Sequence, residues 1–264
     1  MKFRMIKLSN YPIISAKILD YMMKHPSTVV HLEHDGRVLL VNSNGKGPQL
    51  PVQGRMEEGE LMRLPTVEEV RAMEIPWVEM GKTHHNYTDT KTTVIKGYPK
   101  IEWPENWALK DDLIADNFVH PVAREAIYRS IHRLVSKVIV FNQENKILMG
   151  MVERGHFNGF WTLPGGYMDH NEHPRAGCIR EAKEEFGIDV ELIDDSPVVS
   201  QKIFNRDGIS FVSFTYMGKS NATIEEMTLL ENEITEAKWF SIKEAQSIAV
   251  STFDVEALSK LETN

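Results

Sequence analysis

A chain of 264 residues with 42% hydrophobic residues is long enough to bury one large core or two cores of ordinary size. Its net charge of -8 argues against a nucleic-acid surface, which needs a basic patch, and its single cysteine, Cys178, excludes an intramolecular disulfide framework or a cysteine-rich zinc site. Apolar runs are too short for a signal peptide or a membrane span, so we expect a cytoplasmic protein with no membrane partner.

The first part of the chain is predicted to form a helix and then a hairpin. Apolar residues recur at every fourth position from Ile14 to Met22, which predicts a helix over residues 10–24. Two β-type runs, at residues 28–33 and 37–41, are separated by a His-Asp-Gly tripeptide that contains the Asp-Gly turn signal. We therefore expect a β-hairpin at this point.

The middle of the chain is expected to connect two domains. Two prolines make residues 98–104 loop-like, and Trp103 and Trp107 are expected to cover an interface. After Pro121, an apolar stripe with helical spacing predicts a linker helix over residues 121–135, which would lead into the second domain.

The second half begins with another hairpin pattern and reaches a glycine turn. Residues 137–141 and 146–149 are apolar runs separated by a polar turn. Leu163-Pro164-Gly165-Gly166 then supplies a tight turn whose backbone can approach a ligand or an ion, because no Cβ intervenes. Later predicted elements are a strand at 190–193, a hairpin with strands at 202–205 and 209–217, a last strand at 236–241 and a helix at 242–248.

A helix with an acidic face is predicted directly after the glycine turn. Pro174 suits a first helical position, and Gly187 can end a helix in the left-handed conformation. Between them, Glu181, Glu184 and Glu185 lie at i, i+3 and i+4 and therefore on one face. Three uncompensated carboxylates repel one another, and a divalent cation would relieve that repulsion. An all-oxygen cluster suits Mg²⁺ or Mn²⁺ better than zinc. Cysteine in this helix is expected to be part of the core.

Residues 166–188 resemble the Nudix box, G-x5-E-x7-R-E-U-x-E-E-x-G-U, in which U is an aliphatic residue. Every fixed position of that pattern is filled, with Ala182 as a small occupant of the first U. The matching residues are Gly166, Glu172, Arg180, Glu181, Glu184, Glu185, Gly187 and Ile188. The resemblance implies an α/β fold over residues 136–264, namely the Nudix α/β/α sandwich with a mixed sheet.

The resemblance also implies a reaction, the metal-assisted hydrolysis of a nucleoside diphosphate linked to another moiety. Bound Mg²⁺ or Mn²⁺ would neutralise the diphosphate, orient it and lower the pKa of the attacking water. Arg180 would orient the acids, and catalysis would depend most on Glu184 and Glu185. By family pattern the metal ligands would be Glu181, Glu184, Glu185 and the carbonyl of Gly165, with Glu172 supporting the loop or joining them.

Further site residues are expected outside the box. The loop before the last strand holds Glu231 and Glu233, and many Nudix enzymes use a glutamate from this loop as a metal ligand or base. Of these two we favour Glu233 as a catalytic residue. Arg154, in the loop before the box, is a candidate for binding phosphate, and Phe204 and Tyr216 are candidates for lining the substrate cleft.

The first half of the chain is predicted to be a degenerate copy of the second. Leu50-Pro51 precedes Gly54, which is followed by five residues and a glutamate, as in the box. Continuing this spacing puts Ala72 and Met73 at the positions of the final glutamate pair. We therefore expect residues 1–120 to be a smaller, degenerate Nudix-like α/β domain that keeps the scaffold and has lost the cation site.

Several substrates and two other classes of function fit the sequence. ADP-ribose or a related nucleotide sugar is the leading choice, with NADH or an oxidised nucleoside triphosphate behind it. A catalytically silent module that senses a nucleotide is a second class. A Nudix-type transcription factor is a third, although the basic helix-turn-helix that it needs is not apparent. We expect a homodimer, in which the first domain mediates dimerisation or shapes the substrate cleft.

Overall fold

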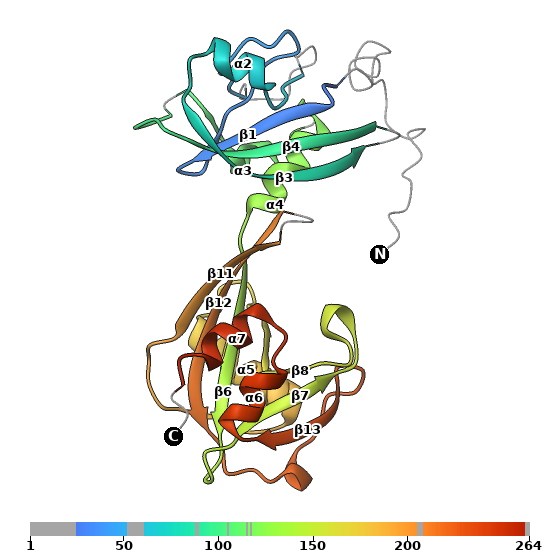
Figure 1. Ribbon diagram of the computed structural model, residues 1–264, viewed down its shortest axis with the longest axis vertical. Helices are drawn as coiled ribbons and strands as arrows, with labels where there is room; N and C mark the ends of the chain where they lie inside the picture. The colour runs from blue at the N-terminus through green and yellow to red at the C-terminus, as the bar shows by residue number, and fades with distance from the viewer. Residues whose placement is uncertain are drawn as a thin grey trace. The chain divides into compact units, whose positions relative to one another are not determined.

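The computed structural model describes residues 25–51, 61–87, 90–104, 106–114, 116, 118–204 and 208–261. The helix predicted over residues 10–24 and the segment from Gly54 to Glu60 lie outside these residues, and that helix stays a prediction. The chain divides into two compact units: the first comprises residues 1–131 and 204–208, and the second comprises residues 132–203 and 209–264. Figure 1 shows the elements of both units, each of which is described by itself below.

The first unit is built on a five-stranded mixed sheet. Its described elements are β1 (Thr28–His34), β2 (Arg37–Val38), α2 (Val67–Ala72), β3 (Trp77–Tyr87), β4 (Thr90–Pro99), β5 (Ala108–Leu109), α3 (Lys110–Leu113) and α4 (Pro121–Ser130). The strand order is β3-β4-β1-β2-β5, in which β1 and β4 run parallel and the other neighbours are antiparallel. The hairpin predicted at the Asp-Gly turn is confirmed as β1 and β2.

Apolar side chains cover both faces of this sheet. On one face, residues of α3 and α4 pack with Val29 and Val94, and on the other, Val70 of α2 packs with Val30 and Trp107. The prediction that Trp107 covers an interface is wrong, because its side chain is buried in this second core.

Helix α4 belongs to the first unit and differs from the predicted linker. The prediction extended a helix over residues 121–135, whereas α4 ends at Ser130 and strand β6 begins at Arg133. The apolar stripe of α4 is buried in the first core; its buried residues are Val122, Ala123, Ala126 and Ile127. A helix whose stripe is fully packed acts as a core element. The boundary between the units therefore falls at Ile131.

The second unit contains an eight-stranded mixed sheet. Its described elements are β6 (Arg133–Phe141), β7 (Ile147–Val152), the 3₁₀ turn η2 (Gly155–Phe157), β8 (Trp161–Thr162), β9 (Gly165–Tyr167), α5 (Pro174–Phe186), β10 (Glu191–Leu192), β11 (Val198–Phe204), β12 (Ile209–Lys219), η3 (Ile224–Glu226), β13 (Ile234–Phe240), α6 (Ile242–Ile248) and α7 (Thr252–Leu258). The main strand order is β10-β12-β6-β7-β13, with β11 paired to β12, β8 to β7 and β9 to β6.

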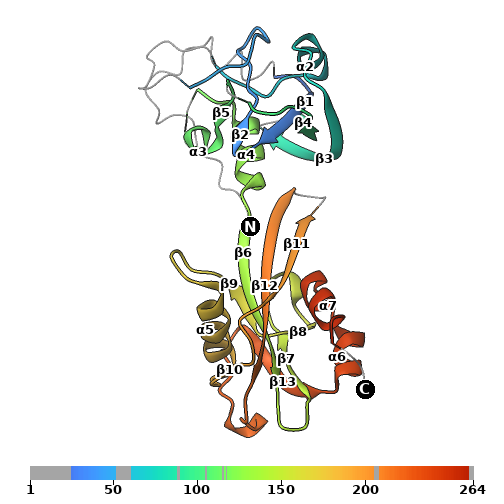
Figure 2. The same ribbon diagram turned by 90° about the vertical axis from the view of Figure 1, so that its left-hand side faces the viewer.

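Helices cover both faces of the second sheet, which confirms the predicted α/β/α sandwich. Figure 2 shows α5 on one side of the strands and α6 and α7 on the other. Cys178, Ala182 and Phe186 of α5 pack in the first of these layers. Ala245 of α6 and Leu258 of α7 pack in the second. The helix predicted at 242–248 is confirmed as α6, whereas α7 was not predicted.

The two units share the order and direction of their strands. In the second unit β12 runs parallel to β6, and β7 pairs antiparallel with both β6 and β13. In the first unit β4 runs parallel to β1, and β2 pairs antiparallel with both β1 and β5. The outer strand before the parallel pair is β11 in one unit and β3 in the other. Helices α5 and α2 occupy corresponding places in the chain.

The correspondence between the units follows a different register from the predicted one. The prediction compared Leu50-Pro51 with Leu163-Pro164. In the structure, the N–H of Val30 in β1 donates to the carbonyl of Pro65 at 2.7 Å, as the N–H of Val138 in β6 donates to the carbonyl of Pro164 at 3.0 Å. Leu64-Pro65 therefore stands where Leu163-Pro164 stands in the second unit.

Helix α2 follows this Leu-Pro pair at once and is short. Thr66 caps its N-terminus, so the chain has no room for a loop like the one between Gly165 and α5. The carboxylate of Glu69 is held by the guanidinium of Arg63 through two hydrogen bonds of 2.6 and 2.7 Å. The described residues of the first unit therefore include no extended acidic helix face like that of α5.

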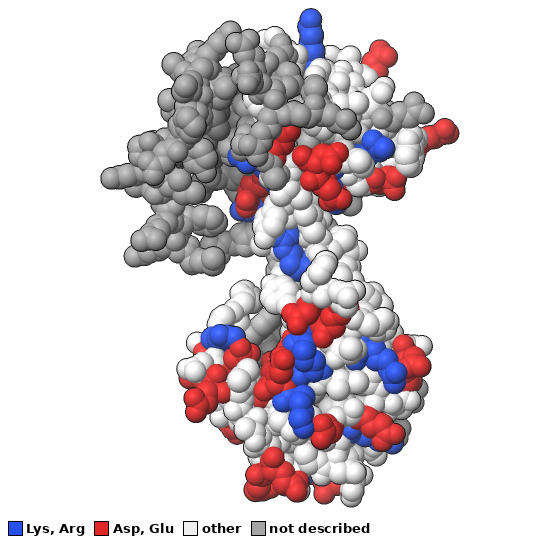
Figure 3. Space-filling view, turned by 180° about the vertical axis from the view of Figure 1, so that it is seen from behind, with Lys and Arg blue, Asp and Glu red and all other residues white. Residues whose placement is uncertain are grey.

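Charged side chains of both signs are spread over the second unit. Figure 3 shows acidic and basic side chains interspersed on one face of it, without a broad basic area. In the part of the chain that the structure describes, no helix is both long and apolar enough to span a membrane.

Three buried histidines make the stability of the first unit depend on pH. Burial lowers the pKa of His25, His31 and His85 from 6.5 to about 4. His25 also stacks on the ring of His120, with 3.7 Å between centroids. As the pH falls, these histidines bind protons near pH 6.5 in the unfolded chain but only near pH 4 in the folded unit. The free energy of unfolding of the first unit therefore decreases as the pH falls from about 6.5 towards 4.

We expect His31→Gln to reduce this pH dependence. Protonation at acidic pH lowers the stability by up to about 3 kcal/mol at His31, because its pKa falls from 6.5 to about 4 on folding and one pKa unit corresponds to about 1.4 kcal/mol. Urea unfolding at about pH 7.5 and about pH 4.5, followed by hydrogen exchange in β1 to β4, measures the effect. His84→Gln is the matched control, because His84 is exposed on the neighbouring sheet strand β3. A wild-type first unit equally stable at both pH values would contradict the prediction.

Candidate active site

The glycine turn after β8 is closely packed against β6. Gly165 has a φ of 142°, and a Cβ at this position would lie 2.4 Å from the carbonyl oxygen of Ser136. A Cβ on Gly166 would lie 2.8 Å from the carboxylate oxygens of Glu181. Only glycine avoids both conflicts, so the backbone of the turn approaches β6 on one side and an acidic side chain on the other.

Helix α5 starts and ends as the sequence predicted. The side chain of His173 accepts a hydrogen bond from the N–H of Arg175, Pro174 occupies the first turn, and Gly187 ends the helix with a φ of 71°. Its packed side includes Cys178, for which burial raises the thiol pKa to about 11. Cys178 is therefore a protonated core residue, as expected, and does not supply a thiolate nucleophile.

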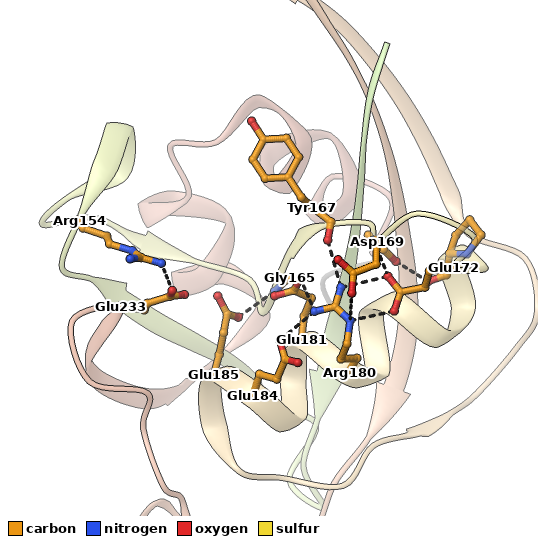
Figure 4. Close-up of polar contacts among 12 residues, drawn as sticks. Arg154, Gly165, Tyr167, Asp169, Glu172, Arg180, Glu181, Glu184, Glu185 and Glu233 are labelled. Atoms are coloured by element: carbon orange, nitrogen blue, oxygen red, sulfur yellow. Dashed lines mark hydrogen bonds and ion pairs between the residues drawn. The ribbon is translucent and has the colours of Figure 1, made fainter. Parts of the chain in front are cut away.

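The guanidinium of Arg180 lies at the centre of the acidic cluster. It donates two hydrogen bonds to the carboxylate of Glu172, at 2.8 and 3.0 Å, and one to the carboxylate of Glu184, at 2.8 Å. It also forms an ion pair with Glu181 at 2.9 Å and donates to the carbonyl of Tyr167 at 3.0 Å. Figure 4 shows these acids arranged around the arginine. The guanidinium of Arg180 thus orients three carboxylates and the backbone of Tyr167, which follows the glycine turn.

The loop between β9 and α5 is closed onto this arginine. Asn171 adopts a left-handed conformation with a φ of 67°, and the N–H of Asp169 donates to the carboxylate of Glu172 at 3.0 Å. The hydrogen bonds from Arg180 hold the pKa of Glu172 below its usual value. Glu172 is therefore ionised and fixes the loop to the helix.

Glu185 lies deeper than its neighbours and faces the glycine turn. Its carboxylate accepts a hydrogen bond from the N–H of Gly165 at 2.9 Å. Burial raises the pKa of Glu185 to about 7, although the bond from Gly165 and the charge of Lys137 oppose this rise. Burial also raises the pKa of Glu181. The cluster thus combines an exposed acid, Glu184, with two acids whose charged forms are disfavoured by burial.

The donor set of this cluster fits a hard divalent cation. It consists of carboxylate oxygens beside backbone groups, which is the ligand chemistry of Mg²⁺ and Mn²⁺. The missing Cβ of Gly166 leaves the Glu181 carboxylate against the turn. Within the described residues, no three acidic, histidine or cysteine side chains converge closely enough to hold a metal ion as they stand. Glu184 faces Arg180 instead, and Glu185 faces the N–H of Gly165.

The structure brings Glu233 to the site and pairs it with Arg154. The loop that carries Glu233 is joined to the end of α5, because the N–H of Leu230 donates to the carbonyl of Glu185 at 3.0 Å. The carboxylate of Glu233 forms an ion pair with the guanidinium of Arg154, from the loop after β7. In Figure 4, Glu233 lies on the same side of the cluster as Glu185. These two residues were predicted separately, and their pairing was not.

The predicted cleft-lining aromatic residues are not brought to the cluster. Phe204 is the last residue of β11, and its contacts group it with the first unit. Tyr216 is buried among the apolar residues beneath α5. Strand alternation explains the position of Tyr216, because Phe214 and Tyr216 pack in the layer of α5, whereas Met217 packs in the layer of α6 and α7.

Two charged residues behind the glycine turn were missed by the sequence analysis. Lys137 of β6 and Asp254 of α7 form an ion pair of 2.8 Å, and the side chain of Asp254 is fully buried. Lys137 was assigned only to an apolar strand, and α7 was not predicted. The signal that remains in the sequence is a lysine within a run of core residues, which requires a buried partner.

Comparisons with known proteins agree with this geometry. The family profile described as "NUDIX domain" matches residues 131–261. An 8-oxo-dGTP diphosphatase of Proteus vulgaris is 37% identical over 57 residues, which cover 22% of this chain and 51% of that protein. Nudix hydrolase 5 of Arabidopsis thaliana is 27% identical over 117 residues, which cover 43% of this chain and 37% of that protein. The chain thus spans about half or less of the length of these two relatives.

A solved structure is also similar. The MutT NUDIX hydrolase from Burkholderia pseudomallei is 22% identical, with a TM-score of 0.43, and the match covers 50% of this chain and 100% of that chain. The profile match, the filled box and the α/β/α sandwich all fall on the second unit. The chain therefore belongs to the Nudix family, with its NUDIX domain at residues 131–261.

Proposed function

We propose that the second unit is a metal-dependent hydrolase that cleaves the diphosphate of a nucleoside diphosphate linked to another moiety. The observation that carries this proposal is the grouping of Glu172, Glu181 and Glu184 around Arg180, beside a glycine turn whose N–H holds Glu185. The two curated relatives support it, because one is named a diphosphatase and the other a Nudix hydrolase.

The cation expected at this site is Mg²⁺ or Mn²⁺. Glu181, Glu184 and Glu185 would hold it, with the carbonyl of Gly165 and with Glu172 in support. When bound, such a cation neutralises the diphosphate and makes a water molecule more acidic. Glu184 is 53% exposed, so its side chain is free to exchange Arg180 for a cation without disturbing the core.

Arg180 prepares the carboxylates for that exchange. A nearby positive charge favours the ionised form of an acid, and hydrogen bonds from a fixed guanidinium fix the orientation of the carboxylates. Glu172 holds the arginine through two bonds, so Arg180 stays in place when Glu184 leaves it. The chain thus keeps Glu172 ionised and the acids grouped before a cation binds.

Glu233 and Arg154 are proposed to act together at the edge of the cluster. Arg154 is 66% exposed and would bind a phosphate oxygen of the substrate, since a guanidinium suits that geometry. Its release would free the carboxylate of Glu233, which would accept the proton of the attacking water. Their ion pair gives both side chains a defined position in the free enzyme.

The substrate is proposed to be ADP-ribose or a related nucleotide sugar. An oxidised nucleoside triphosphate is the second candidate, favoured by the similarity to an 8-oxo-dGTP diphosphatase. NADH hydrolysis and nucleotide sensing without hydrolysis are the remaining alternatives. A screen of nucleotides with Mg²⁺ and with Mn²⁺, resolved by product, separates them, because each substrate releases a different pair of products and a sensor releases none.

Residues 1–120 are proposed to form a degenerate Nudix-like domain, into whose core the following helix α4 packs. Its strand order and directions support this proposal. A homodimer and a cytoplasmic location stay predictions. If the first domain mediates dimerisation, its deletion would reduce the number of chains per particle from two to one, which light scattering measures as a molar mass.

We expect Glu184→Gln to keep the fold and to lower hydrolysis by about 10²-fold or more, because a neutral amide is a poor ligand for a hard cation. Loss of one exposed ion pair costs at most about 1 kcal/mol, so thermal unfolding should be nearly unchanged. Product formation under saturating Mg²⁺ measures the effect. Glu191→Gln, an exposed change on β10, is the control, and near-normal turnover of Glu184→Gln would refute the assignment.

Substitutions of Arg154 and Glu233 should affect substrate binding and the chemical step separately. We expect Arg154→Gln to raise KM several-fold, about 1–2 kcal/mol of phosphate binding, with a smaller change in kcat. Glu233→Gln should lower kcat by about 10²-fold with a smaller change in KM, because it removes the proton acceptor. Steady-state kinetics of both variants provide the measurement. If Glu233→Gln raised KM as much as Arg154→Gln does and left kcat unchanged, Glu233 would only position the arginine.

A further inference from the structure

A buried ion pair lies behind the glycine turn of the second unit. The ammonium of Lys137, in β6, approaches Oδ1 of Asp254, in α7, at 2.8 Å. The side chain of Asp254 is fully buried and that of Lys137 is 10% exposed. The contact lacks the alignment of a hydrogen bond, so it is an ion pair held by charge. The pair joins the sheet to the last helix at the level of the turn.

Both partners are connected directly to the turn. The other carboxylate oxygen of Asp254 accepts a hydrogen bond from the N–H of Leu163 at 3.1 Å. Lys137 is paired with Gly165 across β6 and β9, and its Cγ lies 2.8 Å from the place that a Cβ of Gly165 would occupy. The N–H of Gly165 then donates to Glu185. A continuous path therefore runs from α7 through the turn to the acidic cluster.

Stability alone does not explain this pair. Two charges lose hydration on burial, and their attraction often does no more than offset that loss, so a pair of apolar residues would commonly stabilise the domain as well. Leu163, whose N–H donates to Asp254, is itself packed in the apolar core of this unit. The pair is therefore best explained by what it fixes, which is the backbone from Leu163 to Gly165.

We propose that Lys137 and Asp254 are positioning residues for the cation site, an inference that rests on the proposed function of the second unit. Asp254 holds the start of the turn through Leu163, and Lys137 supports Gly165 and compensates the buried charge of Asp254. Together they fix the turn so that its backbone and the carboxylate of Glu185 face a cation at the same time. Neither residue touches the substrate.

A positioning role and a purely electrostatic role predict different results. If the two residues acted only as charges near the site, removal of the lysine would strengthen cation binding and removal of the aspartate would weaken it. If the pair fixes the turn, either removal weakens binding, and the second removal adds little to the first. The sign of the Lys137 effect therefore decides between the two explanations.

The experiment is a double-mutant cycle of Lys137→Met and Asp254→Asn in the full chain, with Mn²⁺ as the probe. Titration followed by electron paramagnetic resonance gives the dissociation constant of Mn²⁺ without turnover. We expect each single variant to weaken Mn²⁺ binding by about tenfold or more, which is typical when a residue that orients a metal ligand is removed. The double variant should bind Mn²⁺ about as well as the single variant that binds it less tightly. Hydrolysis should show a lower kcat with KM changed by less than about threefold.

Hydrogen exchange provides a second measurement. The amide of Leu163 should lose protection in Asp254→Asn, while amides in β12 keep theirs. Asp189→Asn is the matched control, because it removes an acid that forms an ion pair with Lys183 on the surface of the same unit. It should leave Mn²⁺ affinity within about twofold. Lys137→Gln, which keeps a polar end, replaces Lys137→Met if that variant does not fold.

Tighter Mn²⁺ binding by Lys137→Met, unchanged affinity in both single variants, or effects that multiply independently would each overturn the proposal. Failure of the proposed hydrolase function gives a different result. In that case the wild-type chain would release no products from any nucleotide, although Mn²⁺ binding and the exchange of Leu163 would still report on the pair.

Discussion

The arrangement of acids in the second unit depends on the single positive charge of Arg180. Glutamates that gather on one helix face repel one another, and the repulsion favours their protonated forms. Arg180 offsets this by bonding Glu172, Glu184 and Glu181 in different directions, while it also holds the carbonyl of Tyr167. Helix, loop and strand end are thereby joined at one group. The acids stay grouped without a cation because the guanidinium of Arg180 offsets their mutual repulsion.

The glycine turn is the second constraint, and it works through the absence of side chains. The backbone at Gly165 is so close to β6 that a Cβ would meet a carbonyl oxygen, and at Gly166 it would meet a carboxylate. Apolar packing below the turn and the Lys137–Asp254 pair behind it leave the backbone few alternatives. A rigid support of this kind is needed where a site must bring backbone and side-chain oxygens to one ion.

The first unit shows that the same sheet does not by itself create a site. Its strands have the order and direction of those in the second unit, yet the chain passes from Leu64-Pro65 into a helix of six residues. Between Pro65 and α2 there is no loop that could fold onto an arginine, and the carboxylate of Glu69 is held by Arg63 and by the N–H of Thr66. Scaffold and chemistry are thus separable in this fold, and the length of chain between the Leu-Pro pair and the helix decides between them.

The sequence by itself determined the acidic helix, its ends and its packed side, because Pro174, Gly187 and the helical spacing of Ile179, Ala182 and Phe186 are local signals. It also determined the hairpins, since their turn residues lie between alternating apolar runs. The box residues could be named because their spacing resembles a known pattern, and the roles expected of them come from that resemblance.

Only the tertiary structure decided the pairings that join distant parts of the chain. Sequence spacing carries no record of which side chains meet across strands, so Arg154 with Glu233 and Lys137 with Asp254 could not be predicted. The same limit explains why α4 was taken for a linker and Leu50-Pro51 for the counterpart of Leu163-Pro164. An apolar stripe does not identify the core it fills, and hydrogen bonds to Val30 and Val138 were needed to fix the register.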